Sequence, residues 1–252
     1  MTSGAALQGE NWSMSQEEWR LWDGKGLNLA QSGSELRVWS HENPEAPERI
    51  QWIVGAGFCA MLLRRGTIPW HAAALAFDDK AILIMGGSGT GKSTTAMALI
   101  AAGARLLADD LVAPAAEEGL IVIPPVFLRL RLTRQSADHF CVAGIKGADD
   151  KVSISVPHTL NDRPLPLRAI FVLGDRIVGL GTIERLPKAQ AWAELLRNLF
   201  ARPVVPAFVG SERAATMARR MIDSVPVFQL RTRDGLDRLS DIAETIRAAI
   251  GL

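Results

Sequence analysis

Eight consecutive residues have the composition and spacing of a phosphate-binding loop. The segment from Gly86 to Ser93, GGSGTGKS, matches the pattern G-x-x-x-x-G-K-[ST] at every fixed position. Glycines in such a loop let backbone N–H groups converge on phosphate oxygens at a helix N-terminus, where the helix dipole favours negative charge. We expect Lys92 to bridge the β- and γ-phosphates of ATP and the Ser93 hydroxyl to bind Mg²⁺. The residues predicted to bind the nucleotide are Gly86, Gly87, Ser88, Gly89, Thr90, Gly91, Lys92, Ser93 and Thr94.

Two adjacent carboxylates follow the loop closely. Asp109 and Asp110 end a short apolar segment, Arg105–Ala108, seventeen residues beyond Lys92. A strand packed beside the phosphate-loop strand would bring these carboxylates to the phosphate crevice. One would then hold Mg²⁺ while the other accepts a proton from an incoming hydroxyl. We assign Asp110 to the metal with Ser93, and the division of the two roles stays open; an ordinary strand-ending turn is the alternative.

A histidine lies at the start of the segment that should pair, as a hairpin, with the strand before the loop. From its position alone, His71 is interpreted as a structural histidine. The other histidines have the same interpretation: His41, His139 and His158.

The elements that must position these residues follow from hydrophobic periodicity. Ala81–Met85 is a fully apolar run typical of a buried strand, and the glycine loop ends it. A helix is predicted from Lys92 to about Ala102, with Gly103 as its stop. His71–Phe77 reads as a strand, joined to the next by a tight turn at Asp78-Asp79.

Elements are also predicted on both sides of this stretch. Short strands are expected around Trp19, Trp22 and Leu36–Trp39, followed by a helix from Pro47 to Arg65 that Gly66 ends. Strands are predicted at 120–123, 127–132, 152–156 and 167–173, and helices at 188–201, 211–223 and 235–250. Strands interleaved with helices indicate an α/β fold.

Composition bounds the class of protein. The chain has 252 residues, enough for one α/β domain with a small appendage. Its 28 basic and 27 acidic residues give a net charge of +1, which argues against nucleic-acid binding through a broad basic face. Cys59 and Cys141 are expected to be free thiols. We find neither a signal pattern nor an apolar run of about 20 residues, so a cytoplasmic protein without a membrane partner is expected.

The same residues resemble a known family. His71-Ala-Ala-Ala, the loop with Lys92-Ser93 and the segment Gly103–Asp110 are similar, with their spacings, to the catalytic domain of the HPr kinase/phosphorylases. Leu63–Ala72 is similar to the motif L-R-x-G-x-x-x-x-H-A of compact HPr kinase-related proteins. Some of these phosphorylate a serine of a lasso-peptide precursor.

The resemblance implies a fold, a site and an assembly. The fold is an HPr kinase/PEP carboxykinase-like P-loop domain over residues 63–252, with a mixed sheet flanked by helices, behind a small N-terminal α+β segment of residues 1–62. It implies homo-oligomers, since HPr kinases form hexamers. The implied catalytic residues are His71, Lys92, Asp109 and Asp110. Thr94 stands where HPr kinases usually carry Glu, and their R-G-x-G-I loop has no match here, which counts against HPr itself as the substrate.

We therefore expect an ATP- and Mg²⁺-dependent kinase that phosphorylates a serine hydroxyl of a peptide or protein. One alternative is a kinase of the shikimate- or nucleotide-kinase type that acts on a metabolite or free serine. Such an enzyme needs lid arginines, for which the candidates are Arg129, Arg131 and Arg134. The other alternative is a regulatory ATPase that transfers nothing. Lys151 is interpreted as a solvated turn lysine.

Overall fold

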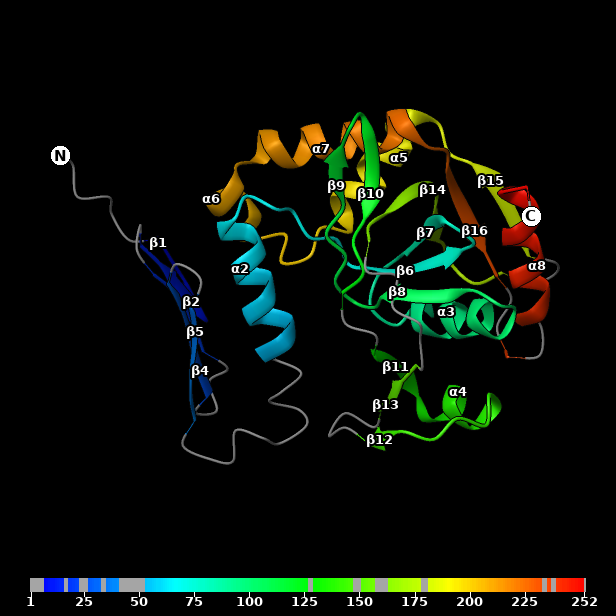
Figure 1. The fold of residues 1–252 in the computed structure, drawn as a ribbon, viewed down its shortest axis with the longest axis horizontal. Coiled ribbons are helices and arrows are strands. Elements are labelled where there is room, and N and C mark those ends of the chain that lie inside the picture. The colour runs from blue at the N-terminus through cyan, green and yellow to red at the C-terminus, as the bar shows by residue number, and fades with distance from the viewer. Residues whose placement is uncertain are drawn as a thin grey trace.

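The computed structural model describes residues 7–15, 18–22, 27–32, 35–40, 53–126, 129–146, 151–156, 163–177, 181–232, 235–236 and 239–251. Within these ranges the strands form three sheets, and helices cover both faces of the largest one (Figure 1).

The largest sheet is mixed. Its main order is β15-β16-β14-β7-β6-β8, and β10 and β9 extend it from one end of β14. β7 runs parallel to β14, and β14 runs parallel to β16, whereas β6 is antiparallel to both β7 and β8. The bounds are β6 Ala72–Phe77, β7 Lys80–Met85, β8 Arg105–Ala108, β9 Ala115–Glu117, β10 Leu120–Ile123, β14 Leu165–Leu173, β15 Thr182–Arg185 and β16 Val227–Arg231.

This order corrects one expectation from the sequence. β8 does not lie beside the phosphate-loop strand β7, because β6 hairpins back from β7 and occupies the place between them. The two antiparallel pairings make β8 run in the same direction as β7. The carboxyl ends of β7, β8, β14 and β16 therefore meet at one edge of the sheet, together with the start of β6.

Helices bury the two faces of this sheet. α3 (Lys92–Ala101) and α8 (Leu239–Ala249) pack on one face, where they meet Leu75 and Ile84. The other face is covered by α2 (Phe58–Arg64), α5 (Lys188–Arg197), α6 (Val205–Val209) and α7 (Ser211–Ser224). Strand β6 is buried along its whole length, which explains why it is apolar at every position. The predicted α/β fold with a mixed sheet between helices is confirmed.

A second sheet precedes this domain. It is an antiparallel meander in the order β1-β2-β3-β4-β5, followed by a π-helix, η1 (Ile53–Gly57), that leads into α2. Trp19 attaches the meander to the rest of the chain: its ring centroid lies 4.3 Å from that of Phe208 in α6. The strand bounds are β1 Leu7–Gly9, β2 Trp12–Met14, β3 Trp19–Trp22, β4 Leu27–Ser32 and β5 Glu35–Ser40.

The predicted helix from Pro47 to Arg65 is seen only in part. Its described portion begins at Ile53, and residues 47–52 lie outside the described ranges. Gly66 ends it with a φ of +74°, as expected. The predicted division after residue 62 falls inside α2, and it stays a prediction.

A third, small sheet lies beside the same edge of the main sheet, where the backbone of Arg131 contacts Asp109. β11 (Arg129–Thr133), β13 (Lys151–Ser155) and β12 (Ile145–Lys146) pair antiparallel in that order, and α4 (Arg134–His139) follows β11 directly. The strands predicted at 127–132 and 152–156 are thus confirmed within the described residues. In the described parts of the chain, no helix has the length and hydropathy to cross a membrane.

Candidate active site

The glycine loop connects β7 to α3, as its pattern requires. Gly86 leaves β7 with a φ of +154°, and Gly91 precedes α3 with a φ of +97°, values that favour glycine. A Cβ at Gly86 would lie 2.6 Å from Thr90 Oγ1. The Thr90 hydroxyl also donates a hydrogen bond to the Gly87 carbonyl, at 2.9 Å. The loop is therefore folded tightly on itself, with the first turn of α3 directly behind it.

Lys92 is the first residue of α3, and its side chain turns back over the loop. Its Nζ donates to the carbonyl oxygens of Gly86 and Gly87, at 2.9 and 3.1 Å, and only 7% of the residue is exposed. Burial lowers the pKa of Lys92, and the neighbouring Asp110 and Asp109 charges oppose that shift. The ammonium group thus lies between the loop and the two carboxylates.

Asp109 faces Ser93. The Ser93 hydroxyl donates to Asp109 Oδ2 at 3.1 Å, and the backbone N–H of Arg131 donates to the same oxygen at 3.3 Å. Asp110 was predicted to hold the metal with Ser93, and that assignment stays a prediction; the carboxylate that is hydrogen-bonded to Ser93 in the structure is that of Asp109. Asp110 has a φ of +71°, a left-handed conformation that non-glycine residues adopt rarely and that recurs at functional sites. This turn directs the two carboxylates to different neighbours.

Asp110 faces His71. Its Oδ1 lies 2.8 Å from His71 Nε2, and the side chains of His71 and Asp110 are 26% and 51% exposed. His71 sits at the start of β6 and Asp110 just past the end of β8, so the antiparallel pairing of these strands brings them together. The structure therefore joins His71 to the aspartate pair, which its sequence position alone did not indicate.

The two neighbouring carboxyl groups differ in acidity. Burial raises the pKa of Asp109 to about 6; the Asp110 charge adds to the shift, and hydrogen bonds from Arg131 and Ser93 oppose it. Burial also acts to raise the pKa of Asp110. The hydrogen bond and positive charge of His71, with the charges of Lys92 and Arg131, outweigh it, so this pKa falls below its ordinary value. Asp110 is therefore ionised at neutral pH, whereas the pKa of Asp109, about 6, lies close to neutral pH.

A cleft of about 530 Å³ holds the loop, His71 and both aspartates. Arg131 of β11 and Lys151 of β13 also line it. Of the three candidate lid arginines only Arg131 lines this cleft, while Arg129 and Arg134 are exposed elsewhere. Lys151 is not a turn lysine: it begins β13 and contributes positive charge to the cleft.

Sequence reasoning missed two residues of this site. Arg176, beyond the end of β14, donates through Nη2 to the Thr90 carbonyl at 3.2 Å and through Nη1 to the Thr232 hydroxyl. It thereby holds the glycine loop from the side of β14 and β16, and it lines the cleft. Its position past the β14 strand predicted at 167–173 was the only available signal.

The second missed residue is Asn198, at the end of α5. Its Oδ1 accepts a hydrogen bond from the Gly86 N–H at 3.0 Å, and its backbone carbonyl accepts one from the His71 N–H at 2.7 Å. Its Nδ2 donates to the Glu194 carbonyl at 2.9 Å, and the residue is 7% exposed. One buried side chain and its carbonyl thus fix the first residue of the loop and the histidine relative to each other.

Comparisons with known proteins give a distant structural likeness. The HPr(Ser) kinase/phosphatase from Coxiella burnetii is similar to this chain with 18% sequence identity and a TM-score of 0.38, over 72% of this chain and 89% of that one. A likeness of that strength carries no conclusion about the site. No protein-family model matches the chain, and no curated protein matches it.

Proposed function

We propose that this protein is an ATP-dependent phosphotransferase that moves the γ-phosphoryl group to a serine hydroxyl of a peptide or small protein. One observation carries the proposal. The Asp110–His71 pair lines the same cleft as Lys92 and the phosphate loop. A proton acceptor beside a phosphate-binding loop is what transfer to a hydroxyl requires.

The residues present fit a magnesium ion at Ser93 and Asp109. Mg²⁺ is usually held by one or two protein oxygens, with water and substrate phosphates as its other ligands. Ser93 Oγ and Asp109 Oδ2 are such a pair, 3.1 Å apart at the N-terminus of α3. When bound, Mg²⁺ supplies positive charge to the phosphate oxygens. A group of three or more His, Cys, Asp or Glu side chains arranged to hold a metal is not found among the described residues.

Asp110 is the proposed base. It is ionised at neutral pH, half exposed to the cleft, and bonded to His71. Its carboxylate accepts the serine proton as the serine oxygen attacks the γ-phosphorus, while the bond from that phosphorus to the β,γ-bridging oxygen breaks and ADP leaves. His71 Nε2 holds the carboxylate in place. Lys92 offsets negative charge on the transferring group. Positioning and fixed charge supply most of the acceleration in phosphoryl transfer, so the rigidity of this pair matters.

The acceptor is proposed from the residue resemblance and from the charged residues that line the cleft. The similarity of Leu63–Ala72 to the motif of the compact HPr kinase-related proteins suggests a peptide, with a lasso-peptide precursor as the specific candidate. A metabolite or free serine is the second candidate, favoured by Arg131 and Lys151, which offer two positive charges inside the same cleft. A homo-oligomer belongs to the proposal on the same resemblance, and the cytoplasmic location expected from the sequence stays a prediction.

A labelling experiment tests this function. The purified protein is incubated with γ-labelled ATP, Mg²⁺ and peptides encoded beside its gene, and each peptide is examined for a mass gain of one phosphate. We expect a phosphoserine that Lys92→Ala and Asp110→Asn abolish and that Asp138→Asn retains, since Asp138 is exposed on α4 away from the cleft. Steady ATP hydrolysis without any phosphorylated peptide, metabolite or serine would contradict the proposal and favour a regulatory ATPase.

A further inference from the structure

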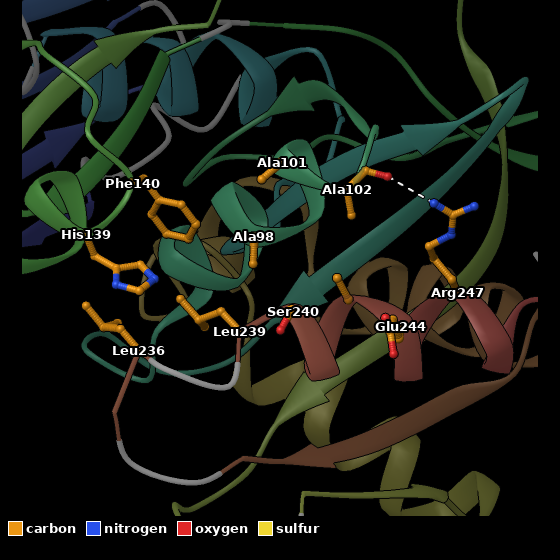
Figure 2. Close-up of a pocket in the computed structure, with 11 residues that line it drawn as sticks. Ala98, Ala101, Ala102, His139, Phe140, Leu236, Leu239, Ser240, Glu244 and Arg247 are labelled. Atoms are coloured by element: carbon orange, nitrogen blue, oxygen red, sulfur yellow. Dashed lines mark hydrogen bonds between the residues drawn. The ribbon is translucent and has the colours of Figure 1, made fainter.

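A second cavity, of about 640 Å³, lies next to the cleft that holds the glycine loop, His71 and both aspartates, which is called the phosphate cleft below. This second cavity has no part in the chemistry proposed above. Figure 2 shows it between α3, the end of α4 and α8. Its floor is one side of α3, with Ala98, Ala101 and Ala102. The rings of His139 and Phe140 stand on one side, and Leu236 and Leu239 border it from the approach to α8.

This cavity continues the phosphate cleft. Leu236 lines both spaces. Along α3, Thr94 lines the phosphate cleft, and Ala98 and Ala101 follow it at the i+4 and i+7 spacing of one helical face. At 1.5 Å per residue, these alanines lie about 6 to 11 Å beyond Thr94. A ligand with its phosphates on the loop reaches the cavity by extending along one side of α3.

The cavity has the chemistry of a site for a flat heteroaromatic group. Three alanines give a smooth apolar floor, and the His139 and Phe140 rings meet edge to face with centroids 5.0 Å apart. Polar atoms lie at the margin, on Ser240 and Glu244. Small-molecule sites are of this kind, mostly apolar with a few polar groups that fix orientation. A nucleobase has apolar faces and a polar edge, and it stacks on aromatic side chains.

An arginine lines the cavity where α3 ends. Arg247 of α8 donates through Nη1 to the Ala102 carbonyl at 3.0 Å, and its guanidinium lies 5.6 Å from the centroid of the Phe77 ring. These contacts tie α8 to the end of α3, which fixes the width of the space between the two helices. The cavity, called the slot below, is therefore bounded by two helices that the chain's own contacts hold together, and it shares Leu236 with the cleft of the glycine loop.

We propose that this slot binds the purine base of the nucleotide whose phosphates occupy the glycine loop. The assignment rests on the proposed function, because it requires a nucleotide on that loop. It adds to that function the residues that hold the base: the α3 alanines below it, the His139 and Phe140 rings beside it, and Leu236 where the base joins the rest of the nucleotide.

Titration calorimetry with two ligands tests the assignment. ATP and inorganic tripolyphosphate, each with Mg²⁺, are titrated into the wild type, Ala101→Phe and Ala248→Phe. Ala101 is an exposed helix position on the cavity floor, so phenylalanine there fills the slot; Ala248 is an exposed position of α8 outside it. We expect Ala101→Phe to raise the Kd for ATP about tenfold or more and to leave the Kd for tripolyphosphate within about twofold, whereas Ala248→Phe changes neither.

A second variant and the outcomes complete the test. His139→Ala removes an exposed ring from the side of the cavity. We expect it to raise the Kd for ATP several-fold and to leave the Kd for tripolyphosphate unchanged. An unchanged ATP affinity in both slot variants, in a protein that binds ATP and tripolyphosphate, overturns the base site alone. A wild type that binds neither ligand overturns the proposed function and the base site together.

Discussion

His71 Nε2 and Asp110 Oδ1 lie 2.8 Å apart, although they are thirty-nine positions apart in the chain and β6, β7, α3 and β8 all lie in the segment between them. That segment also contains the glycine loop. The strands that begin and end the segment, β6 and β8, are direct neighbours in the sheet. A histidine–carboxylate pair is thereby built around the phosphate loop by strand pairing, and its members do not depend on a flexible loop for their alignment.

Substitutions of the two aspartates should have different effects on the phosphate-transfer activity. Asp110→Asn removes the proposed base and should lower kcat by about 10²- to 10⁴-fold with little change in the Mg²⁺ concentration required. Asp109→Asn removes a carboxylate beside Ser93 and should raise the Mg²⁺ concentration for half-maximal activity. Magnesium titrations of phosphate transfer measure both. The opposite pattern would exchange the roles and restore Asp110 as the metal ligand.

Asn198 should act as a positioning residue. Asn198→Ala leaves the buried Gly86 N–H without its acceptor, which typically costs about 1–3 kcal/mol. We expect lower stability and a raised Kd for tripolyphosphate, because the first residue of the loop is no longer fixed. Asn198→Asp keeps the acceptor for Gly86 and should recover part of the tripolyphosphate affinity. Equal affinities in wild type and Asn198→Ala would show that the loop keeps its shape without this bond.

Asp109 should make the stability of the metal-free protein depend on pH. Its pKa of about 6 is above the ordinary value of 3.8. Its contribution to stability is therefore complete below about pH 4 and is lost as the pH rises through about 6. The asparagine of Asp109→Asn cannot ionise. In EDTA, the free energy of unfolding of this variant should therefore be about 1–3 kcal/mol higher than that of the wild type near pH 8 and equal to it near pH 4. Urea unfolding at the two pH values measures the difference. A variant less stable than the wild type near pH 8 would contradict the expected sign.

The two thiols should differ in reactivity. Cys59 is buried in α2, and burial raises its pKa to about 12, whereas Cys141 is exposed. A thiol reagent should label one cysteine in the native protein and two after denaturation. Cys141→Ser, the matched variant, should lose the native labelling. Rapid native labelling of Cys141→Ser would show that α2 opens readily.

The sequence predicted well those parts of the site that are local in the chain. Met85, the glycine loop and Lys92 follow one another directly, so an apolar run and a spaced motif are enough to place β7, the loop and α3. The pairing of Asp109 with Ser93 was not predicted. The contact joins the start of α3 to the end of β8, and it is followed at Asp110 by a left-handed backbone conformation for which the residue type gives no clear signal.

Asn198 and Arg176 were missed for a different reason. Asn198 contacts Gly86 across 112 residues, and Arg176 contacts Thr90 across 86. Their roles follow from which strands are neighbours and from where α5 ends, and neither fact has a pattern in a single sequence. The hairpin of β6 with β7 was predicted correctly. β8, by contrast, was expected beside β7 and lies beyond β6, because apolar runs do not show with which strand of a hairpin the next strand pairs.

The two hydrogen bonds from Lys92 Nζ to backbone carbonyls affect how strongly the loop can bind an anion. Two of the three N–H donors of Nζ are already bonded to the Gly86 and Gly87 carbonyls, so an anion that takes these donors gains only the difference between its own bonds and the ones it displaces. A lone phosphate replaces them roughly one for one. A chain of phosphates that also fills the amide cradle of the loop gains more than it displaces. On the proposed function, the lysine bonds therefore favour the binding of an extended polyphosphate over that of a single phosphate.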